Sequence, residues 1–431
     1  MLLIYTHITS SRLQYICHFI FRDLLGIDFN ITVDSEEFKN YDGPKINYSD
    51  SPIPDHGIWI KKQELLFEEL IIPQRIVCFE WNGTKAFFKT GTADYPFDIF
   101  AATFYLISRY EEYLPHAKDE YGRYAHGNSL AFKEEFLNLP LVNIWVKDFA
   151  QKLKAKHSTF NIQHSTFAFL PTYDIDIAYS YKHKGLTRNI GGFFTSPSLE
   201  RIRVLFNSKK DPFDAYDWLD ELHQQNNFHP IYFFLVAEKN GPYDKNILPH
   251  KDAMWDLVER HAKKYKVGLH PSWQSGDDVA LIKKEKVQLE AMRDHISSRV
   301  TASRQHYIRF NLPLTYQRLI DAGFTDDYSM GYGSINGFRA SVASSFYWYD
   351  LEKEDQTDLR IHPFCFMDAN SFYEQKQSAA ETLDEMNHYY EQCRSVDGMM
   401  ITIWHNNFLG DTKMFHGWKD IYKQFIARVQ Q

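Results

Sequence analysis

Short apolar runs alternate with amphipathic segments over the C-terminal part of the chain. The runs include 167–173, 229–237, 267–270 and 399–404, and segments of helical periodicity, ten to twenty residues long, follow or separate them. Strands that alternate with helices in this way form parallel βαβ units. Roughly seven repeats can be counted, which predicts an α/β fold, a distorted (β/α)7 TIM-like barrel.

The first 160 residues have a different pattern. Residues 2–6 are apolar like a buried strand, 12–26 have helical periodicity, and short strand-like runs precede two more helical segments at 97–114 and 141–156. This region contains no glycine-rich phosphate loop and no paired catalytic residues. We therefore predict a smaller α+β N-terminal domain, residues 1–160, with a packing or substrate-shaping role. Residues 161–431 would form the barrel domain.

Polar residues directly follow the apolar runs of the predicted barrel. They are Asp174, Asp176, His270, Arg304, His306, Asp368 and His405. In parallel barrels the active site lies at the carboxyl ends of the strands. Strand ends that repeatedly carry Asp, His or Arg therefore predict one shared site.

Asp174 and Asp176 are two positions apart, so on a strand their carboxylates share one face and repel each other. A divalent metal bound by Asp176 and His270 would relieve this repulsion and leave Asp174 as a base toward water. The pair could also belong to a solvated turn or to a metal pair of the glycosyltransferase type. His405 could be a general acid, a further ligand or a structural histidine, and His270 could likewise be structural.

Composition narrows the classes of partner. Lys and Arg number 48 against 56 Asp and Glu, a net charge of −8, which disfavours a nucleic-acid partner because phosphates require a basic surface. Aromatic residues make up 16% of the chain, and exposed rings suit the apolar faces of sugars. Trp273, which follows GLHPS (268–272), is a candidate for such stacking or for core packing.

The four cysteines are scattered without a CxxC pair, which favours a reducing compartment over a disulfide scaffold or a thiolate zinc site. No apolar run approaches the ~18 residues of a membrane span, and no cleavage-site pattern follows the apolar start. We expect a cytoplasmic protein without a transmembrane segment. The sequence gives no prediction of the oligomeric state.

Six short motifs occur in a fixed order between residues 165 and 410. They are TYDID (172–176), GLHPS (268–272), RQHYIRF (304–310), GFTDDYSMGY (323–332), GFRAS (337–341) and TIWHNN (402–407). Together they resemble the polysaccharide deacetylase family, carbohydrate esterase family 4 with its NodB-homology domain. FYLISRYEEY (104–113) is similar to a domain of unknown function that precedes this module in Bacteroidetes-type proteins.

The resemblance implies a metal-dependent hydrolase that removes N-acetyl groups from an amino-sugar-containing glycan or glycan precursor. It implies that Asp174 is the catalytic base, that Arg304 positions it, and that His405 protonates the leaving amine. Asp176 and His270 match metal ligands. Arg339 lies in a segment that shapes the pocket, with a substrate-contact or structural role.

One position departs from the family pattern. The second metal histidine usually stands four residues after the first, where this chain has Gln274. His306 is the candidate for the missing ligand, although it could instead pack beside Arg304. Gln274 could itself be the ligand, although it is a poor one for zinc, or the site could bind metal weakly or not at all. Zinc is the expected metal, with cobalt or nickel possible.

Two functions besides N-deacetylation therefore stay open. The chain could be a non-catalytic glycan-binding or regulatory protein with a degenerate deacetylase site. It could also be an O-deacetylase or a C–N hydrolase of small amides. Stoichiometric metal distinguishes a hydrolase from a glycan-binding protein, and acetate release from defined sugars distinguishes the kinds of hydrolase.

Overall fold

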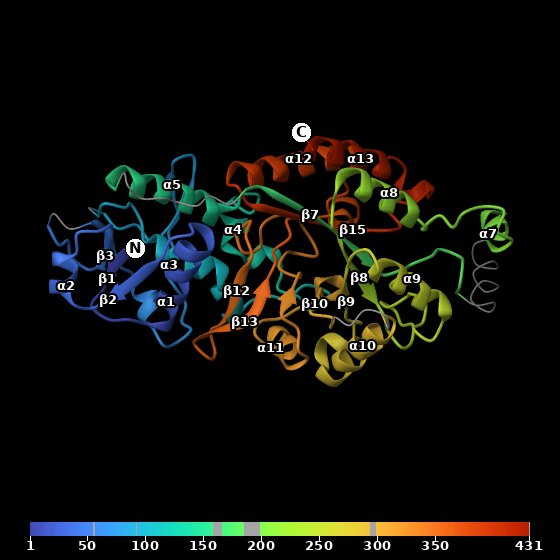
Figure 1. Cartoon of the computed structure of the whole chain (residues 1–431), viewed down its shortest axis with the longest axis horizontal. Coiled ribbons are helices and arrows are strands. Elements are labelled where there is room, and N and C mark those ends of the chain that lie inside the picture. The colour runs from blue at the N-terminus through green and yellow to red at the C-terminus, as the bar shows by residue number, and fades with distance from the viewer. Residues whose placement is uncertain (55–56, 92, 158–165, 185–198, 294–298, 431) are drawn as a thin grey trace.

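The computed structural model describes residues 1–430 except 55–56, 92, 158–165, 185–198 and 294–298 (Figure 1). The N-terminal elements occupy one end of an elongated molecule, and a larger sheet with its helices occupies the rest. The predicted boundary at residue 160 lies outside the described residues, so the domain division stays a prediction. Within the described part, no helix has the length and apolar character to cross a membrane.

The N-terminal sheet has four parallel strands in the order β2-β1-β3-β4. They are β1 (Leu2–Tyr5), β2 (Phe29–Thr32), β3 (Lys45–Ser49) and β4 (Ile58–Lys61). Helix α1 (Ser11–Cys17), which Ser10 caps, continues as a π-helical turn, η1 (His18–Leu24), and α2 (Ser35–Asn40) connects β2 to β3. Helical crossovers between parallel strands make this sheet α/β in character, whereas we predicted an α+β domain.

The rest of the N-terminal part consists of one hairpin, helices and helical turns. They are η2 (Glu64–Phe67), the hairpin β5 (Phe79–Trp81) and β6 (Thr84–Ala86), α3 (Ile99–Ile107), η3 (Tyr110–Tyr113), η4 (His126–Asn128), α4 (Leu130–Lys133) and α5 (Leu141–Lys156). The helix predicted over 97–114 is interrupted because Arg109 has a φ of 55°. That left-handed residue ends α3 and turns the chain into η3.

A nine-stranded sheet forms the centre of the described C-terminal part, in the order β12-β13-β11-β10-β9-β8-β7-β15-β14. Its strands are β7 (Ala168–Ile175), β8 (Ile231–Leu235), β9 (Lys266–His270), β10 (Ala302–Ser303), β11 (Asp326–Asp327), β12 (Phe346–Asp350), β13 (Asp355–Ile361), β14 (Phe366–Met367) and β15 (Met399–His405). Neighbouring strands are parallel except β12 and β13. The α/β class is thus confirmed, while closure of the sheet into a barrel stays a prediction because β12 and β14 are its edges.

Helices lie on both sides of this sheet (Figure 1). They are α7 (Leu199–Leu205), α8 (Tyr216–Asn226), α9 (Asp252–Ala262), α10 (Val279–Ala291), α11 (Leu314–Asp321), α12 (Ala379–Ser395) and α13 (Trp418–Val429). The short turns are η5 (Ser275–Asp277), η6 (His306–Ile308), η7 (Asn370–Glu374), which is π-helical, and η8 (Lys413–Phe415). β7 reads as a long apolar run because it is central, with β8 and β15 as neighbours.

One hydrophobic core extends through both parts of the molecule. Phe19 of η1 contacts Phe346 of β12, and the rings of Tyr15 and Phe104 both contact Tyr349. All five residues are nearly inaccessible to solvent. The N-terminal part therefore packs on the outer strands of the large sheet through apolar surface.

A buried charge cluster, which we call the closed cluster, also joins the two parts. It consists of Arg109, Glu111, Glu112 and Arg339. Arg339 donates from Nε and Nη2 to the two carboxylate oxygens of Glu112, at 2.8 and 2.6 Å, and Arg109 Nε donates to Glu112 at 2.7 Å. Burial would raise the pKa of Glu112, but the two guanidinium groups outweigh it and lower the pKa to about 2.

Candidate functional site

The parallel strands bring their carboxyl ends to one edge of the sheet. Asp174 lies near the end of β7 and is level with His405 on β15, while Asp176 follows β7 directly. His270 is the last residue of β9, and His306 follows β10 within η6. The topology thus gathers side chains that are up to 231 positions apart, Asp174 to His405, at a single edge.

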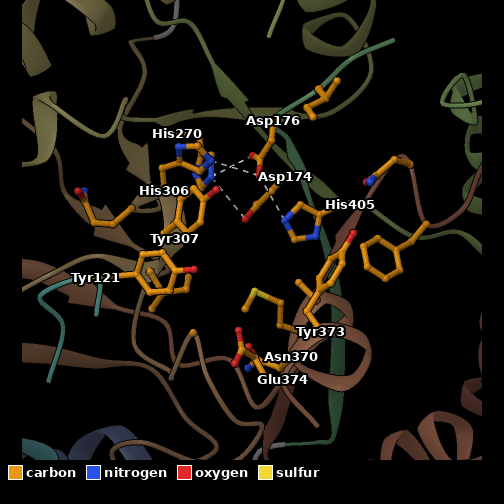
Figure 2. A pocket seen from close by; sticks show the side chains of 18 of the residues that line it. Tyr121, Asp174, Asp176, His270, His306, Tyr307, Asn370, Tyr373, Glu374 and His405 are labelled. Carbon is orange, nitrogen blue, oxygen red and sulfur yellow. Dashed lines mark ion pairs between the residues drawn. The ribbon is translucent and has the colours of Figure 1, made fainter. Parts of the chain in front are cut away.

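Asp176, His270 and His306 converge on one point (Figure 2). His270 Nε2 lies 3.1 Å from Asp176 Oδ1, and His306 Nε2 lies 3.4 Å from Asp176 Oδ2. The possible ligand atoms of the three residues all lie within 4.8 Å of one another. We call this group the open cluster, and its geometry is that of residues that could hold a metal ion.

The hydrogen bonds of the two histidines fit a metal. His270 Nδ1 lies 2.6 Å from the carbonyl oxygen of Arg304, and His306 Nδ1 lies 3.0 Å from Asp244 Oδ1. Both partners only accept, so each Nδ1 carries the proton and each Nε2 is free to bind a cation. Asp176 Oδ1 is buried and accepts no hydrogen bond of ordinary geometry. One carboxylate and two imidazoles are a ligand set that zinc accepts.

The electrostatics of the open cluster favour a positive charge beside Asp176. Burial would raise the pKa of Asp176, but His306 and His270 together lower it well below its usual range. Burial would lower the pKa of His306, but the carboxylates of Asp176 and Asp244 raise it to about 9. A proton or a cation at this point therefore balances the buried carboxylate.

Asp174 is held from one side only. Arg304, which is fully buried, donates from Nη1 to Asp174 Oδ1 at 2.8 Å and from Nε to the Tyr328 carbonyl at 3.0 Å. The second carboxylate oxygen, Oδ2, lies 3.9 Å from His270 Nε2, beside the open cluster. One oxygen of Asp174 is thus fixed by the guanidinium and its twin faces the candidate metal position.

His405 is oriented by Asp368, which follows β14. Asp368 accepts from the backbone N–H of His405 at 2.7 Å and lies 2.6 Å from its Nδ1, and it is itself inaccessible to solvent. Burial would lower the pKa of His405, but Asp368 and Asp176 raise it well above its usual range. Nε2 of His405 points toward Asp176 at 3.5 Å. The imidazole is therefore held in one orientation and favours its protonated form.

A cavity of about 440 Å³ opens over these residues (Figure 2). Asp174, Asp176, His270, His306 and His405 line one side. The remaining sides carry aromatic and polar side chains, namely Tyr121, Tyr307, Asn370, Tyr373 and Glu374. Its size lies toward the lower end of the roughly 300–1,000 Å³ of small-molecule sites.

Besides Arg304 and Asp368, which lie behind Asp174 and His405, three predicted residues lie outside this cavity lining. Arg339 is buried in the closed cluster with Glu112, which favours the structural one of its two predicted roles. Trp273 packs on Tyr243 with ring centroids 3.9 Å apart, which favours packing over sugar contact. Gln274 is exposed and is not part of the open cluster, whereas His306 lies in it beside Asp176 and His270.

Several residues of the site escaped sequence reasoning. Asp244 lies between β8 and α9, and Tyr121 lies between η3 and η4, so no strand end marks either one. Asp368 stood out as a strand-end carboxylate, but its pairing with His405 did not. The position of Asp368 directly after the apolar run FCFM was the signal that could have placed it beside His405.

Residues 2–158 match the model of a family of unknown function, DUF7033, which covers less than half of the chain. The chain matches no curated protein. Among solved structures it is similar to a protein assigned as a polysaccharide deacetylase from Mycobacterium smegmatis, with 14% identity, a TM-score of 0.40, and coverage of 62% of this chain and 84% of that one.

Two further solved structures show comparable likeness. A 4-alpha-glucanotransferase from Thermococcus litoralis shares 11% identity at a TM-score of 0.36, over 62% of this chain and 38% of that one. A protein assigned as a polysaccharide deacetylase from Pseudomonas aeruginosa PAO1 shares 11% identity at a TM-score of 0.37, over 61% of this chain and 85% of that one.

Proposed function

We propose that this chain is a metal-dependent hydrolase that removes N-acetyl groups from an amino-sugar-containing glycan or glycan precursor. The observation that carries the proposal is the open cluster on one side of a cavity, with Asp174 and His405 beside it. Each of these two residues is held by its own buried partner, Arg304 or Asp368. A base, an acid and three candidate ligands thus face one cavity.

Asp176, His270 and His306 would hold the metal, with zinc favoured over cobalt or nickel. When bound, such a cation would polarise a carbonyl oxygen and lower the pKa of water toward neutrality. We assign this site to residues 161–431, as a NodB-homology domain with a distorted (β/α)7 barrel, and a packing or substrate-shaping role to residues 1–160.

Asp174 acts as the general base in this mechanism. Its Oδ1 is engaged by Arg304, so Oδ2 is the oxygen that accepts a proton from the attacking water. Arg304 is not among the described residues that line the cavity, and it works by positioning the carboxylate.

His405 acts as the general acid. Its Nδ1–H donates to Asp368, which leaves Nε2–H to face the cavity. The raised pKa of His405 keeps this proton in place at neutral pH, so that it can be delivered to the leaving nitrogen of the sugar. The products would be acetate and an amino sugar.

Metal analysis of the purified chain tests the cluster. We expect about one zinc per chain after reconstitution. His270→Ala and His306→Ala should lose it, while Gln274→Ala, the matched control for a ligand at the usual family position, should retain it. If Gln274→Ala loses the metal and His306→Ala keeps it, the assignment of His306 is wrong.

Acetate release tests the reaction. N-acetylglucosamine oligomers should release acetate with the zinc-loaded wild type, and Asp174→Asn should reduce kcat by about 10²–10⁴-fold while retaining zinc. Release only from O-acetylated sugars or from small amides would replace the proposed substrate class. A chain that binds glycans, but neither binds metal nor releases acetate, would instead be a glycan-binding protein.

A further inference from the structure

One wall of the cavity comes from the N-terminal part of the chain. Tyr121 and Arg123 line the cavity, although every other residue of its lining lies beyond residue 173. Both belong to a tight turn, here called the 118–124 hairpin, in which Lys118 bridges to Tyr124. The candidate active site is therefore assembled from both parts of the molecule.

The 118–124 hairpin is rigidly built. Asp119 accepts from the backbone N–H groups of Tyr121 and Arg123, at 3.0 and 2.9 Å, and pairs with Arg123 Nε at 2.6 Å. Arg123 Nη1 donates to the Tyr307 carbonyl at 2.7 Å, which ties the hairpin to the residue after His306. A Cβ on Gly333 would lie 2.8 Å from the same Tyr307 carbonyl oxygen and 2.0 Å from the Arg123 nitrogen, so glycine suits this close approach.

Aromatic rings support Tyr121 from several directions. Its ring lies 5.3 Å from that of Tyr307 and is tilted by 34°. Trp273 and Tyr243, which stack on each other, both contact Tyr121 edge-on. The Arg123 guanidinium carbon lies 4.7 Å from the centroid of the Tyr121 ring. Tyr121 is therefore a preorganised ring at the cavity wall, which suits the apolar face of a sugar.

The wall opposite Tyr121 comes from η7, the π-helical turn. Figure 2 shows Tyr373 facing Tyr121 across the cavity, with Asn370 and Glu374 on a third side and the catalytic residues on the fourth. An extended polymer needs a groove that is open at both ends. A cavity of about 440 Å³ with side chains on four sides instead fits about one or two sugar rings.

The charge of the walls also selects the ligand. Among the described residues that line the cavity, Arg123 alone carries a permanent positive charge, and Asp119 neutralises it. Glu374, on the third side of the cavity, is negative. An anionic sugar would meet uncompensated negative charge at this end, whereas hydroxyl groups can donate to Glu374.

We propose that the 118–124 hairpin closes the site so that it accepts only a terminal or free uncharged N-acetylated sugar, with Tyr121 as the stacking residue. This inference rests on the proposed function and names its substrate class. Tyr121 is a specificity-determining residue, and Arg123 is a positioning residue that fixes it. The N-terminal part thereby decides which sugar reaches the candidate metal site.

Chito-oligosaccharides of one to six N-acetylglucosamine units test the inference with the zinc-loaded full chain. Mass spectrometry should find one acetyl group removed per oligomer, from a terminal sugar. Tyr121→Ala should raise KM about five- to tenfold with a smaller change in kcat, while Tyr121→Phe keeps the ring and the wild-type KM. Deacetylation of internal sugars by the wild type, or an unchanged KM in Tyr121→Ala, would overturn it.

Tyr41→Ala serves as the matched control, because Tyr41 is also a partly buried tyrosine of the N-terminal part but lies outside the cavity lining. If the wild type releases no acetate at all, the proposed function fails, and equilibrium binding of the disaccharide decides the inference separately. Weaker binding to Tyr121→Ala than to Tyr41→Ala supports it, and equal binding refutes it. N-acetylglucosamine 6-phosphate should bind more weakly than the neutral sugar, and tighter binding would contradict the charge argument.

Discussion

Two clusters of buried charge lie in this molecule and differ in how their charges are satisfied. In the closed cluster, Glu112 meets a guanidinium group at each carboxylate oxygen. In the open cluster, Asp176 meets the Nε2 atoms of His270 and His306, and His405 Nε2 lies 3.5 Å away; Asp176 Oδ1 accepts no hydrogen bond of ordinary geometry. In the first arrangement two permanently charged side chains balance the carboxylate, whereas in the second a proton or a cation must balance it.

The comparison teaches how to separate structural from functional buried charge. Burial of an ionised group is costly in both places, so each must be compensated. Compensation by complementary side chains, as around Arg339, fixes two parts of a fold together. Convergence of acceptors on one point, next to a cavity, indicates a ligand position instead.

The largest expected effect is in the closed cluster. Arg339→Met leaves Glu112 buried with Arg109 alone, and we expect the free energy of unfolding to fall by about 3–5 kcal/mol. Urea denaturation measures this loss, and Arg22→Met, at an exposed pair with Asp28, is the control. A loss as small as that of the control would mean that the closed cluster does not stabilise the fold.

The closed cluster should also make the free energy of unfolding depend on pH in the acid range. The pKa of Glu112 is lowered from 4.5 to about 2, so its stabilisation is fully present above pH 4.5 and is lost as the pH falls toward 2. The stability difference between wild type and Glu112→Gln should therefore be constant from pH 7 to 5 and narrow by up to about 3 kcal/mol below that. Urea denaturation of both proteins at pH 6, 5, 4 and 3 measures this stability difference. A gap that stays constant down to pH 3 contradicts the lowered pKa.

In the open cluster, the sharpest test is a substitution of Asp244, the hydrogen-bond partner of His306. Asp244→Asn keeps the shape but removes the charge behind Nδ1, and zinc affinity should fall about 10–100-fold. Competition with a chromophoric chelator measures the change, and Asp277→Asn, an exposed carboxylate paired with Arg309, is the control. Equal affinities in both variants would remove His306 from the ligand set.

The smallest effect is expected at an exposed ion pair between the two parts. Lys147 of α5 lies 3.0 Å from Asp397, but both side chains are more than a third exposed. Lys147→Met should therefore cost less than about 1 kcal/mol in urea denaturation. A loss comparable to that of Arg339→Met would show that contact between the parts, rather than burial, sets the cost.

The sequence could predict those site residues that directly follow a recognisable strand. Asp176 and His270 follow apolar runs, and parallel topology dictates that such residues meet. His306 was open between two roles, because the strand before it is only Ala302–Ser303 in the structure and so short a strand gives little signal. Directly after His306, Tyr307 and Ile308 turn the chain with positive φ values, and His306 Nε2 lies 3.4 Å from Asp176 Oδ2.

Local sequence patterns could not predict contacts between residues of distant loops. Arg339 was placed at the pocket from its motif, but its carboxylate partner Glu112 lies 227 positions away. Tyr121 and Asp244 belong to loops whose direction depends on tertiary contacts rather than on periodicity. The parallel N-terminal sheet was likewise missed, since strands of four or five residues give little signal of their pairing.

The continuous core has a consequence for how the chain is made. Tyr15, Phe19 and Phe104 leave the ribosome long before Phe346 and Tyr349, against which they pack. Until then the N-terminal part has an uncovered apolar face. The nascent chain therefore needs protection from aggregation over most of its synthesis, and the two parts should reach their final packing in one late cooperative step.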